Sequence, residues 1–459
     1  MNRAEIQWSL KNSLVHSRRH RARDFPYFRV LILALLFRAI LDVGYVGFVV
    51  PIFGYDGFVY EMAPLRYAIS LLAIGIAIWC LMVSRKSVLI YVYYIVFLLV
   101  ILPATTFYAL GGANQYSFFA NLIVYCALVF FLPRHKGEEL KNDLKMAVDR
   151  RVIYTSIAFI LFCAGFLLIS SGGNFVLGFE DVYEFRAENT QVGIFAYFTN
   201  WATKLVAPFL LASAIVRGGM MRIGLALMVI FLLYALTGHK SVLAPIGLCA
   251  IAYFFNGGKS GGSRNAGVNP GFFLASTGAL LAFTVLIYAT YVIYENVLFP
   301  SVFFRRTYFT PAFLNSVYFE MFSRQGFVYW SNSFLSPFID YPYADTITHE
   351  VGAYLGRDGM GANTGFVASG FMQAGYLGVA IYFIAVASLN YFVARFGSRV
   401  NPVIFNSILF MPYLTLFSSS DLPTTILTHG LGLAAILLAV LSKKVKIKGR
   451  SFSRPSSIN

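Results

Sequence analysis

The sequence predicts an all-α, polytopic integral membrane protein with about 12 transmembrane helices. Of its 459 residues, 58% are hydrophobic and only 12% are charged. The mean hydropathy is +0.69, and many apolar runs approach the roughly 20 residues that a helix needs to cross a bilayer. The four cysteines lie inside apolar runs without the spacing of a zinc site, so we expect neither disulfides nor structural zinc.

Twelve apolar runs predict the membrane spans in order. The first contains Arg38 and Asp42 and has no small-residue cleavage site, which predicts a retained span and not a signal peptide. Residues 223–256 are short for two spans, but a single span there would reverse every basic loop downstream, so two short spans are predicted. The predicted spans cover about 30–53, 67–84, 87–103, 117–133, 152–170, 194–216, 223–236, 242–256, 271–294, 366–394, 402–418 and 426–442.

The basic residues predict that both termini lie in the cytoplasm. The segments on that side hold 26 of the 36 Lys and Arg residues, as the positive-inside rule requires. We therefore predict a basic cytoplasmic segment (1–29), a membrane domain (30–442) and a basic cytoplasmic tail (443–459). The largest outer segment covers about 295–365, between spans nine and ten. Because the positive charge orients the loops, it does not indicate nucleic acid binding.

Three of the cations in or near the predicted spans have specific expectations. Arg38 and Asp42, four residues apart, are expected to form a neutralising pair. Lys204 lies about one turn inside the outer end of span six, where an unpaired charge costs about 2.5–3.5 kcal/mol, so we expect it to need an anionic partner. Lys240 follows His239 in the outer turn "TGHKS". It is expected to contact either phospholipid headgroups or a substrate phosphate.

The outer segment begins with two adjacent arginines in "FFRRTYFTPAF". Arg305 and Arg306 have no acid close in sequence that would neutralise them. Thr310 as N-cap and Pro311 at the first helical position predict a helix that runs to about Ser323. This helix would place three apolar side chains on one face, namely Phe313, Val317 and Met321.

Further polar residues of the outer segment are candidates for chemistry. Glu320 and Arg324 are spaced to form a salt bridge on the predicted helix. The stretch "THEVGAYLGRDGMGANTGF" lacks the second histidine of a zinc protease motif. The chain also has no phosphate-binding loop, DxD motif or GxSxG elbow. The possible general bases are His349, Glu350, Asp358, Glu320 and His239. The first three of these are the predicted catalytic residues. The predicted glycan contacts are Asn363, Glu320 and Trp330.

These absences predict a substrate that brings its own activated bond, because no nucleotide is present outside the membrane. A polyprenyl-diphosphate-linked glycan meets this requirement, with no metal and no cofactor. Arginine binds such anionic groups through bidentate, charge-assisted hydrogen bonds. The predicted diphosphate-binding residues are Arg305, Arg306, Arg186, Lys240, Arg324 and Arg357.

Four stretches give the chain a family resemblance. They are "GGANQYS" (111–117), "TGHKSVLAPIGL" (237–248), "FFRRTYFTP" (303–311) and "GANTGFVASGFMQAGYLGVAIYF" (361–383). In order and spacing the chain resembles the Wzy-type O-antigen polymerases of the bacterial inner membrane. The resemblance implies a metal-independent glycosyltransferase with a large periplasmic loop. By position, the arginines that matter in this family correspond to Arg186 and to Arg305 and Arg306.

The resemblance also implies substrates and partners. The donor and the acceptor would both be undecaprenyl-diphosphate-linked oligosaccharides, joined on the periplasmic face of the lipid bilayer in lipopolysaccharide O-antigen biosynthesis. A chain-length regulator and a flippase would work with the enzyme. Two other functions stay open, an O-antigen ligase that transfers glycan to lipid A core and a polysaccharide flippase. The long outer loop and the lack of an internal repeat count against the flippase.

Overall fold

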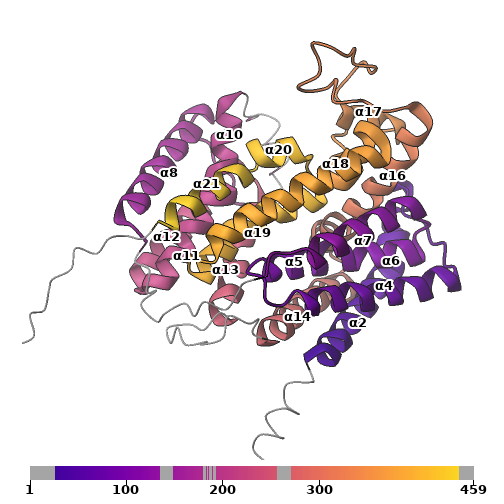
Figure 1. Ribbon diagram of the computed structural model, residues 1–459, viewed down its shortest axis with the longest axis horizontal. Coiled ribbons are helices and arrows are strands. Elements are labelled where there is room, and N and C mark those ends of the chain that lie inside the picture. The colour runs from indigo at the N-terminus through magenta and orange to yellow at the C-terminus, as the bar shows by residue number, and fades with distance from the viewer. Residues whose placement is uncertain are drawn as a thin grey trace, which may run out of the picture.

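The computed structural model describes residues 26–134, 148–178, 182, 185, 189, 193–255 and 270–443. In these residues the regular secondary structure is helical, apart from one isolated bridge between Glu61 and Gly111. Figure 1 shows α18 (Phe366–Gly397) and α19 (Pro402–Ser418) running through the middle of the molecule. One group of helices, from α2 to α7, lies on one side, and α8 and α10 to α13 lie on the other.

Eight described helices are long and apolar enough to cross a membrane. This confirms, for the described residues, an all-helical polytopic membrane fold. In chain order the elements that form them are α2 (Pro26–Gly44) with η1 (Tyr45–Val49), α3 (Val50–Phe53) and η2 (Gly54–Asp56); α4 (Pro64–Val83); α5 (Ile90–Val96) with η3 (Phe97–Ile101) and α6 (Leu102–Leu110); α8 (Arg150–Ser170); α10 (Ile194–Trp201) with η4 (Ala202–Val206) and α11 (Ala207–Arg217); α12 (Met220–Thr237); α14 (Pro270–Tyr294); and α18.

Four shorter apolar helices occupy the remaining predicted spans. They are α7 (Gln115–Phe130), η5 (Lys240–Leu243) with α13 (Ala244–Phe255), α19, and α21 (Leu431–Leu441), which follows the short α20 (Leu422–Leu427). All twelve predicted positions are therefore helical. That the four shorter helices also cross the membrane stays a prediction.

Proline explains where the long helices change their winding. Four π-helical segments, η1, η3, η4 and η7 (Ser301–Phe309), occur in the described residues. Each ends two residues before a proline, namely Pro51, Pro103, Pro208 and Pro311. The proline ring clashes with the carbonyl one turn earlier and lacks an N–H, and a π-turn relieves this conflict without ending the helix. Pro412 of α19 has no such segment before it.

The prediction of a helix start at Thr310 is wrong. The chain is already helical from α15 (Leu298–Pro300) through η7, and α16 (Thr310–Gln325) continues it. The Thr310 hydroxyl does not cap a helix but donates to the Arg305 carbonyl at 2.9 Å. The predicted apolar face is confirmed, because Phe313, Val317 and Met321 are all buried.

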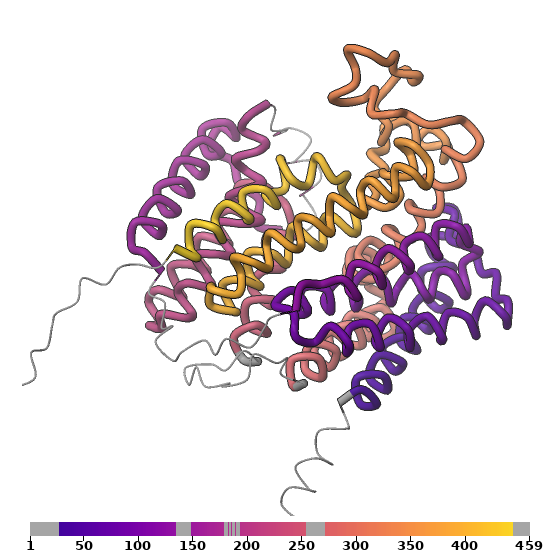
Figure 2. The backbone as a smooth tube through the Cα atoms, in the orientation of Figure 1, coloured from indigo at the N-terminus to yellow at the C-terminus, as the bar shows by residue number. Residues whose placement is uncertain are grey.

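The outer segment forms helices at one end of the bundle. α16 and α17 (Ile347–Tyr354) lie there beside the first turns of α18, and Figure 2 shows the chain between α16 and α17 projecting beyond the helix ends. The described part of predicted segment 295–365 is thus partly helical. Its assignment to the periplasm stays a prediction.

Helix α18 is broken near its start. Ala374 has φ −155° and Gly375 has φ +60°, a backbone conformation that favours glycine. The two halves of the helix approach each other closely at Gly370 and Gly378. A Cβ on Gly378 would lie only 2.0 Å from the Gly370 carbonyl oxygen.

The break leaves backbone carbonyls of α18 without their helical partners, and the chain after α16 supplies new ones. The Val328 N–H donates to the Met372 carbonyl at 3.0 Å, and the Tyr329 N–H donates to the Gln373 carbonyl at 2.8 Å. Tyr329 and Trp330 both have positive φ, 51° and 57°, which is uncommon for bulky residues. This docked segment therefore fixes the outer segment to the start of α18.

Candidate functional site

Two of the predicted arginines meet at one buried carboxylate. Asp56, 6% exposed, ends the 3₁₀ turn η2 at the end of the first long helix. Arg305 Nη1 contacts its Oδ2, and Arg357 Nη2 contacts its Oδ1. The sequence places these three residues far apart, and the fold joins them. We call Asp56, Arg305 and Arg357 the guanidinium cluster.

Neighbouring groups hold the two arginines in place. The Arg305 guanidinium lies 4.2 Å from the centre of the Phe53 ring, a cation–π contact, and Nη2 is 3.4 Å from Ser301 Oγ. Arg357 Nη2 donates to the Tyr55 carbonyl at 3.3 Å. Burial lowers the pKa of Arg305, and the Asp56 carboxylate opposes this effect. Arginine stays charged in proteins, so the cluster carries two positive charges and one negative charge.

Arg305, which has no acid close in sequence, is therefore neutralised by an acid from a distant part of the chain. The search for an acid near in sequence missed Asp56, which follows the first span. Arg306, the next residue, is exposed. The two adjacent arginines thus differ: Arg305 turns inward to Asp56, whereas Arg306 faces outward.

The other predicted site residues lie in separate places. Glu320 and Arg324 form the predicted salt bridge, 3.0 Å long, with Arg324 68% exposed. His349 Nδ1 is 3.1 Å from Asp345 Oδ2. The Glu350 carboxylate accepts the N–H groups of Ala344 and Asp345, at 3.1 and 2.7 Å, which makes it part of the turn before α17.

The remaining predicted residues show no common centre. Asp358 and Asn363 are exposed, and Lys240 is half-buried where η5 begins. Arg186 lies outside the described residues. Trp330 belongs to the docked segment, where its indole N–H donates to the Tyr382 hydroxyl at 3.1 Å. The predicted site residues therefore lie at several separate places. Among the described residues, only the guanidinium cluster brings together two of the predicted diphosphate-binding residues that are not neighbours on one helix.

A carboxylate that the sequence analysis missed lies near Trp330. Asp421 begins α20, and its Oδ1 accepts the Leu422 N–H at 2.8 Å. Ser369 and Tyr382 of α18 face the carboxyl group. Burial raises the pKa of Asp421, an effect that the two neighbouring hydroxyls and the Leu422 N–H oppose. The available signal was an acid between spans eleven and twelve, followed by Leu-Pro.

Lys204 has a neutral partner in place of the expected anion. It lies in η4, and its Nζ is 2.8 Å from Nδ1 of His429, which follows α20. Among the described residues no carboxylate lies within ion-pairing distance of this ammonium. The expected anionic partner is therefore not found among the described residues.

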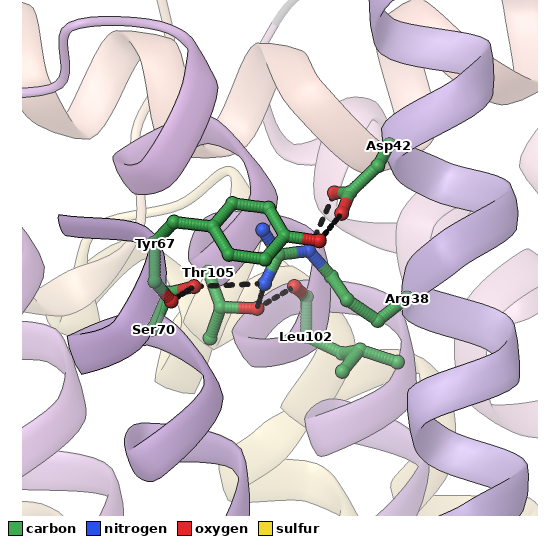
Figure 3. Close-up of polar contacts among 6 residues, drawn as sticks. All are labelled: Arg38, Asp42, Tyr67, Ser70, Leu102 and Thr105. Atoms are coloured by element: carbon green, nitrogen blue, oxygen red, sulfur yellow. Dashed lines mark hydrogen bonds and ion pairs between the residues drawn. The ribbon is translucent and has the colours of Figure 1, made fainter. Parts of the chain in front are cut away.

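The predicted Arg38–Asp42 pair is confirmed, and Figure 3 shows its surroundings. Arg38 Nε donates to Asp42 Oδ1 at 2.6 Å. Arg38 Nη1 donates to the hydroxyls of Ser70 at 3.0 Å and Thr105 at 3.2 Å, and the Tyr67 hydroxyl donates to Asp42 Oδ2 at 2.9 Å. This cluster joins α2, α4 and α6 inside the bundle, so we assign it a structural role.

The described residues contain no group of three or more His, Cys, Asp or Glu side chains that could hold a metal ion. A cavity of about 230 Å³ lies at the far end of α18, lined by Arg134, Tyr391 and Arg395 among others. None of the predicted site residues lines it.

Comparisons of the chain with protein-family models, with curated proteins and with solved structures give no match.

Proposed function

We propose that this protein is an O-antigen polymerase, a metal-independent glycosyltransferase of the bacterial inner membrane. It joins undecaprenyl-diphosphate-linked repeat units on the periplasmic face. The proposal rests on the resemblance of the sequence and on one structural observation. That observation is the convergence of Arg305 and Arg357 on Asp56 at the end of a membrane helix.

The guanidinium cluster suits a lipid diphosphate. It lies at the end of the first long helix, which by the predicted topology is the outer membrane boundary, where the diphosphate of a polyprenyl lipid resides. Two guanidinium groups against one carboxylate leave a net positive charge for an anionic ligand. Arg305 Nε, moreover, makes no hydrogen bond in the described part of the chain. Arg306, exposed beside Arg305, adds a further cation.

Asp56 gives the cluster its geometry. Each of its two oxygens holds one guanidinium group, so both side chains are positioned before substrate arrives. Such preorganisation reduces the entropy that binding costs. The planar arrangement of guanidinium donors matches two phosphate oxygens, whereas the ammonium of lysine acts as a point charge.

Conservative substitutions in the purified protein test this proposal. Arg305→Lys keeps a charge that neutralises Asp56 but loses the bidentate geometry. Hydrogen bonds to charged groups contribute about 1.5–3 kcal/mol, so ladder formation should slow by about ten- to a hundred-fold. Arg357→Lys should do the same. Arg222→Lys is the matched control, because Arg222 is exposed on the predicted cytoplasmic side.

The assay incubates each variant with the lipid-linked repeat unit isolated from the source cells and separates the products by size. Parent-rate ladders from both Arg305→Lys and Arg357→Lys would show that the cluster does not bind the diphosphate. A ladder lost in chelator and restored by magnesium would contradict the metal-independent mechanism. A single transfer to lipid A core without a ladder would identify a ligase.

A further inference from the structure

Two reactive side chains flank the short helix α20. Asp421 lies directly before it, and His429, paired with Lys204, lies just after it. The end of α20 is fixed to the helix that carries Lys204, because the Trp201 indole N–H donates to the Leu427 carbonyl at 2.7 Å. The Asp421 carboxyl group and the pair of His429 with Lys204 therefore lie at the two ends of α20.

The Asp421 carboxyl group has the environment of a proton acceptor. It is half-buried, and it faces Ser369 and Tyr382 of α18 and lies near Tyr318 of α16. These three neighbours carry hydroxyls, and among the described residues no cation lies within ion-pairing distance of Asp421. Burial without a cation makes a carboxylate more basic than an exposed one.

The ammonium of Lys204 has the environment of an anion site. An ammonium can only donate hydrogen bonds, so Nδ1 of His429 accepts and the imidazole is neutral. The positive charge is then held in place but not balanced by any described carboxylate. An anionic ligand would supply the partner that the sequence analysis expected.

The length of α20, which lies between Asp421 and His429, is of the size that a displacement reaction needs. α20 has six residues, which gives about 9 Å of helix. A base lies about 3 Å from the hydroxyl that it deprotonates, and the reacting oxygen and carbon approach to about 3–3.5 Å. The cation lies beyond the leaving oxygen on the opposite side of that carbon. A base and a cation in this arrangement are therefore roughly 10 Å apart.

We infer that the surroundings of α20 form the reaction centre of the polymerase, in which Asp421 is the general base and Lys204 binds the leaving diphosphate. The acceptor hydroxyl oxygen attacks the anomeric carbon of the donor glycan, and its proton passes to the Asp421 carboxylate. The bond from that carbon to the diphosphate oxygen breaks, and the electron pair leaves on the polyprenyl diphosphate beside Lys204. Asp421 then releases its proton to water. This inference rests on the proposed function.

In this arrangement the guanidinium cluster binds the diphosphate of the second lipid, the acceptor. The acceptor reacts at its non-reducing end, a whole repeat unit away from its own diphosphate, so the two diphosphates need separate sites. Arg305 and Tyr318 lie on the continuous helix of η7 and α16, roughly 20 Å apart along its axis at 1.5 Å per residue. The guanidinium cluster and the Asp421 side of the reaction centre are thus set apart along this helix, which leaves room for a donor and an acceptor with separate diphosphate sites.

Asp421→Asn separates catalysis from structure. Asparagine caps a helix as well as aspartate does, but its amide cannot accept the proton. We expect ladder formation to fall by at least about a hundred-fold, with undecaprenyl diphosphate still bound. The parent rate should fall as pH falls through the raised pKa of Asp421, because only the carboxylate is a base, and the residual rate of Asp421→Asn should not show this fall. Asp149→Asn is the matched control, since Asp149 is the N-cap residue of α8 and its side chain also accepts a backbone N–H.

Lys204→Met tests the binding of the diphosphate separately from catalysis. Binding of undecaprenyl diphosphate to the purified protein should weaken at least about ten-fold, as for loss of a charge-assisted contact, whereas Lys204→Arg should retain it. Parent-level polymerisation by Asp421→Asn, or unchanged binding by Lys204→Met, would overturn this reaction centre and leave the proposed function standing. A parent protein that forms no ladder would instead overturn the function, and this inference with it.

Discussion

Removal of Asp42 should destabilise the protein more than any other single change in the cluster of Figure 3. Arg38 is 1% exposed and Asp42 is 14% exposed. Asp42→Ala leaves the guanidinium group with two hydroxyl partners, Ser70 and Thr105, and no counter-charge. Breaking a buried ion pair by removing one partner costs about 3–5 kcal/mol, and we expect this cost here.

The reverse change should cost less. Arg38→Met leaves Asp42 with the Tyr67 hydroxyl as donor, and a carboxyl group can also take up a proton. A buried acceptor left partly satisfied costs about 1–3 kcal/mol. The double variant Arg38→Met with Asp42→Leu buries no charge, and such replacements are often neutral or stabilising. The two single effects should therefore not add.

The assay is unfolding of the purified protein in mixed micelles with increasing dodecyl sulfate, followed by tryptophan fluorescence. Glu320→Ala with Arg324→Ala is the matched control, because this pair has the same spacing but is exposed, and exposed pairs contribute about 0–1 kcal/mol. A loss below about 1 kcal/mol for Asp42→Ala, or additive effects in the double variant, would refute the assignment of a structural role to this cluster.

Two further predictions concern topology and the broken helix. Single cysteines in a cysteine-free background should react with a membrane-impermeant reagent in spheroplasts at positions 115, 188 and 340 but not at 140, 260 and 450; labelling at 260 would reverse the topology downstream. Gly378→Ala places a Cβ 2.0 Å from the Gly370 carbonyl oxygen, so the folded yield in size-exclusion chromatography should collapse, whereas Gly165→Ala in α8, with nothing within 4 Å, should be tolerated. Equal yields from the two alanine variants would contradict the close approach within α18.

Local patterns in the sequence were enough to predict the apolar helices and two of the short-range pairs. Apolar runs locate the long helices, because burial in lipid or protein requires them. Spacing by one helical turn identifies Arg38 with Asp42 and Glu320 with Arg324. The same rule places Phe313 on the buried face of α16.

Contacts between distant segments could not be predicted in this way. Arg305 and Arg357 meet Asp56 only because the outer segment folds back on the end of the first long helix. The Thr310-Pro311 pair has the residues of a helix start, but the π-turn before it lets the helix continue. Lys204 was expected to have an anionic partner, and its partner among the described residues is an imidazole from the chain between α20 and α21.

The break in α18 also bears on how the protein is made. A membrane helix with unpaired carbonyls is costly to insert, and the donors for Met372 and Gln373 come from Val328 and Tyr329. These donors precede α18 in the chain, so a ribosome delivers them before the helix that needs them. By the predicted topology they have already been translocated when α18 enters the bilayer. The order of synthesis thus allows the broken helix to be capped as it is inserted.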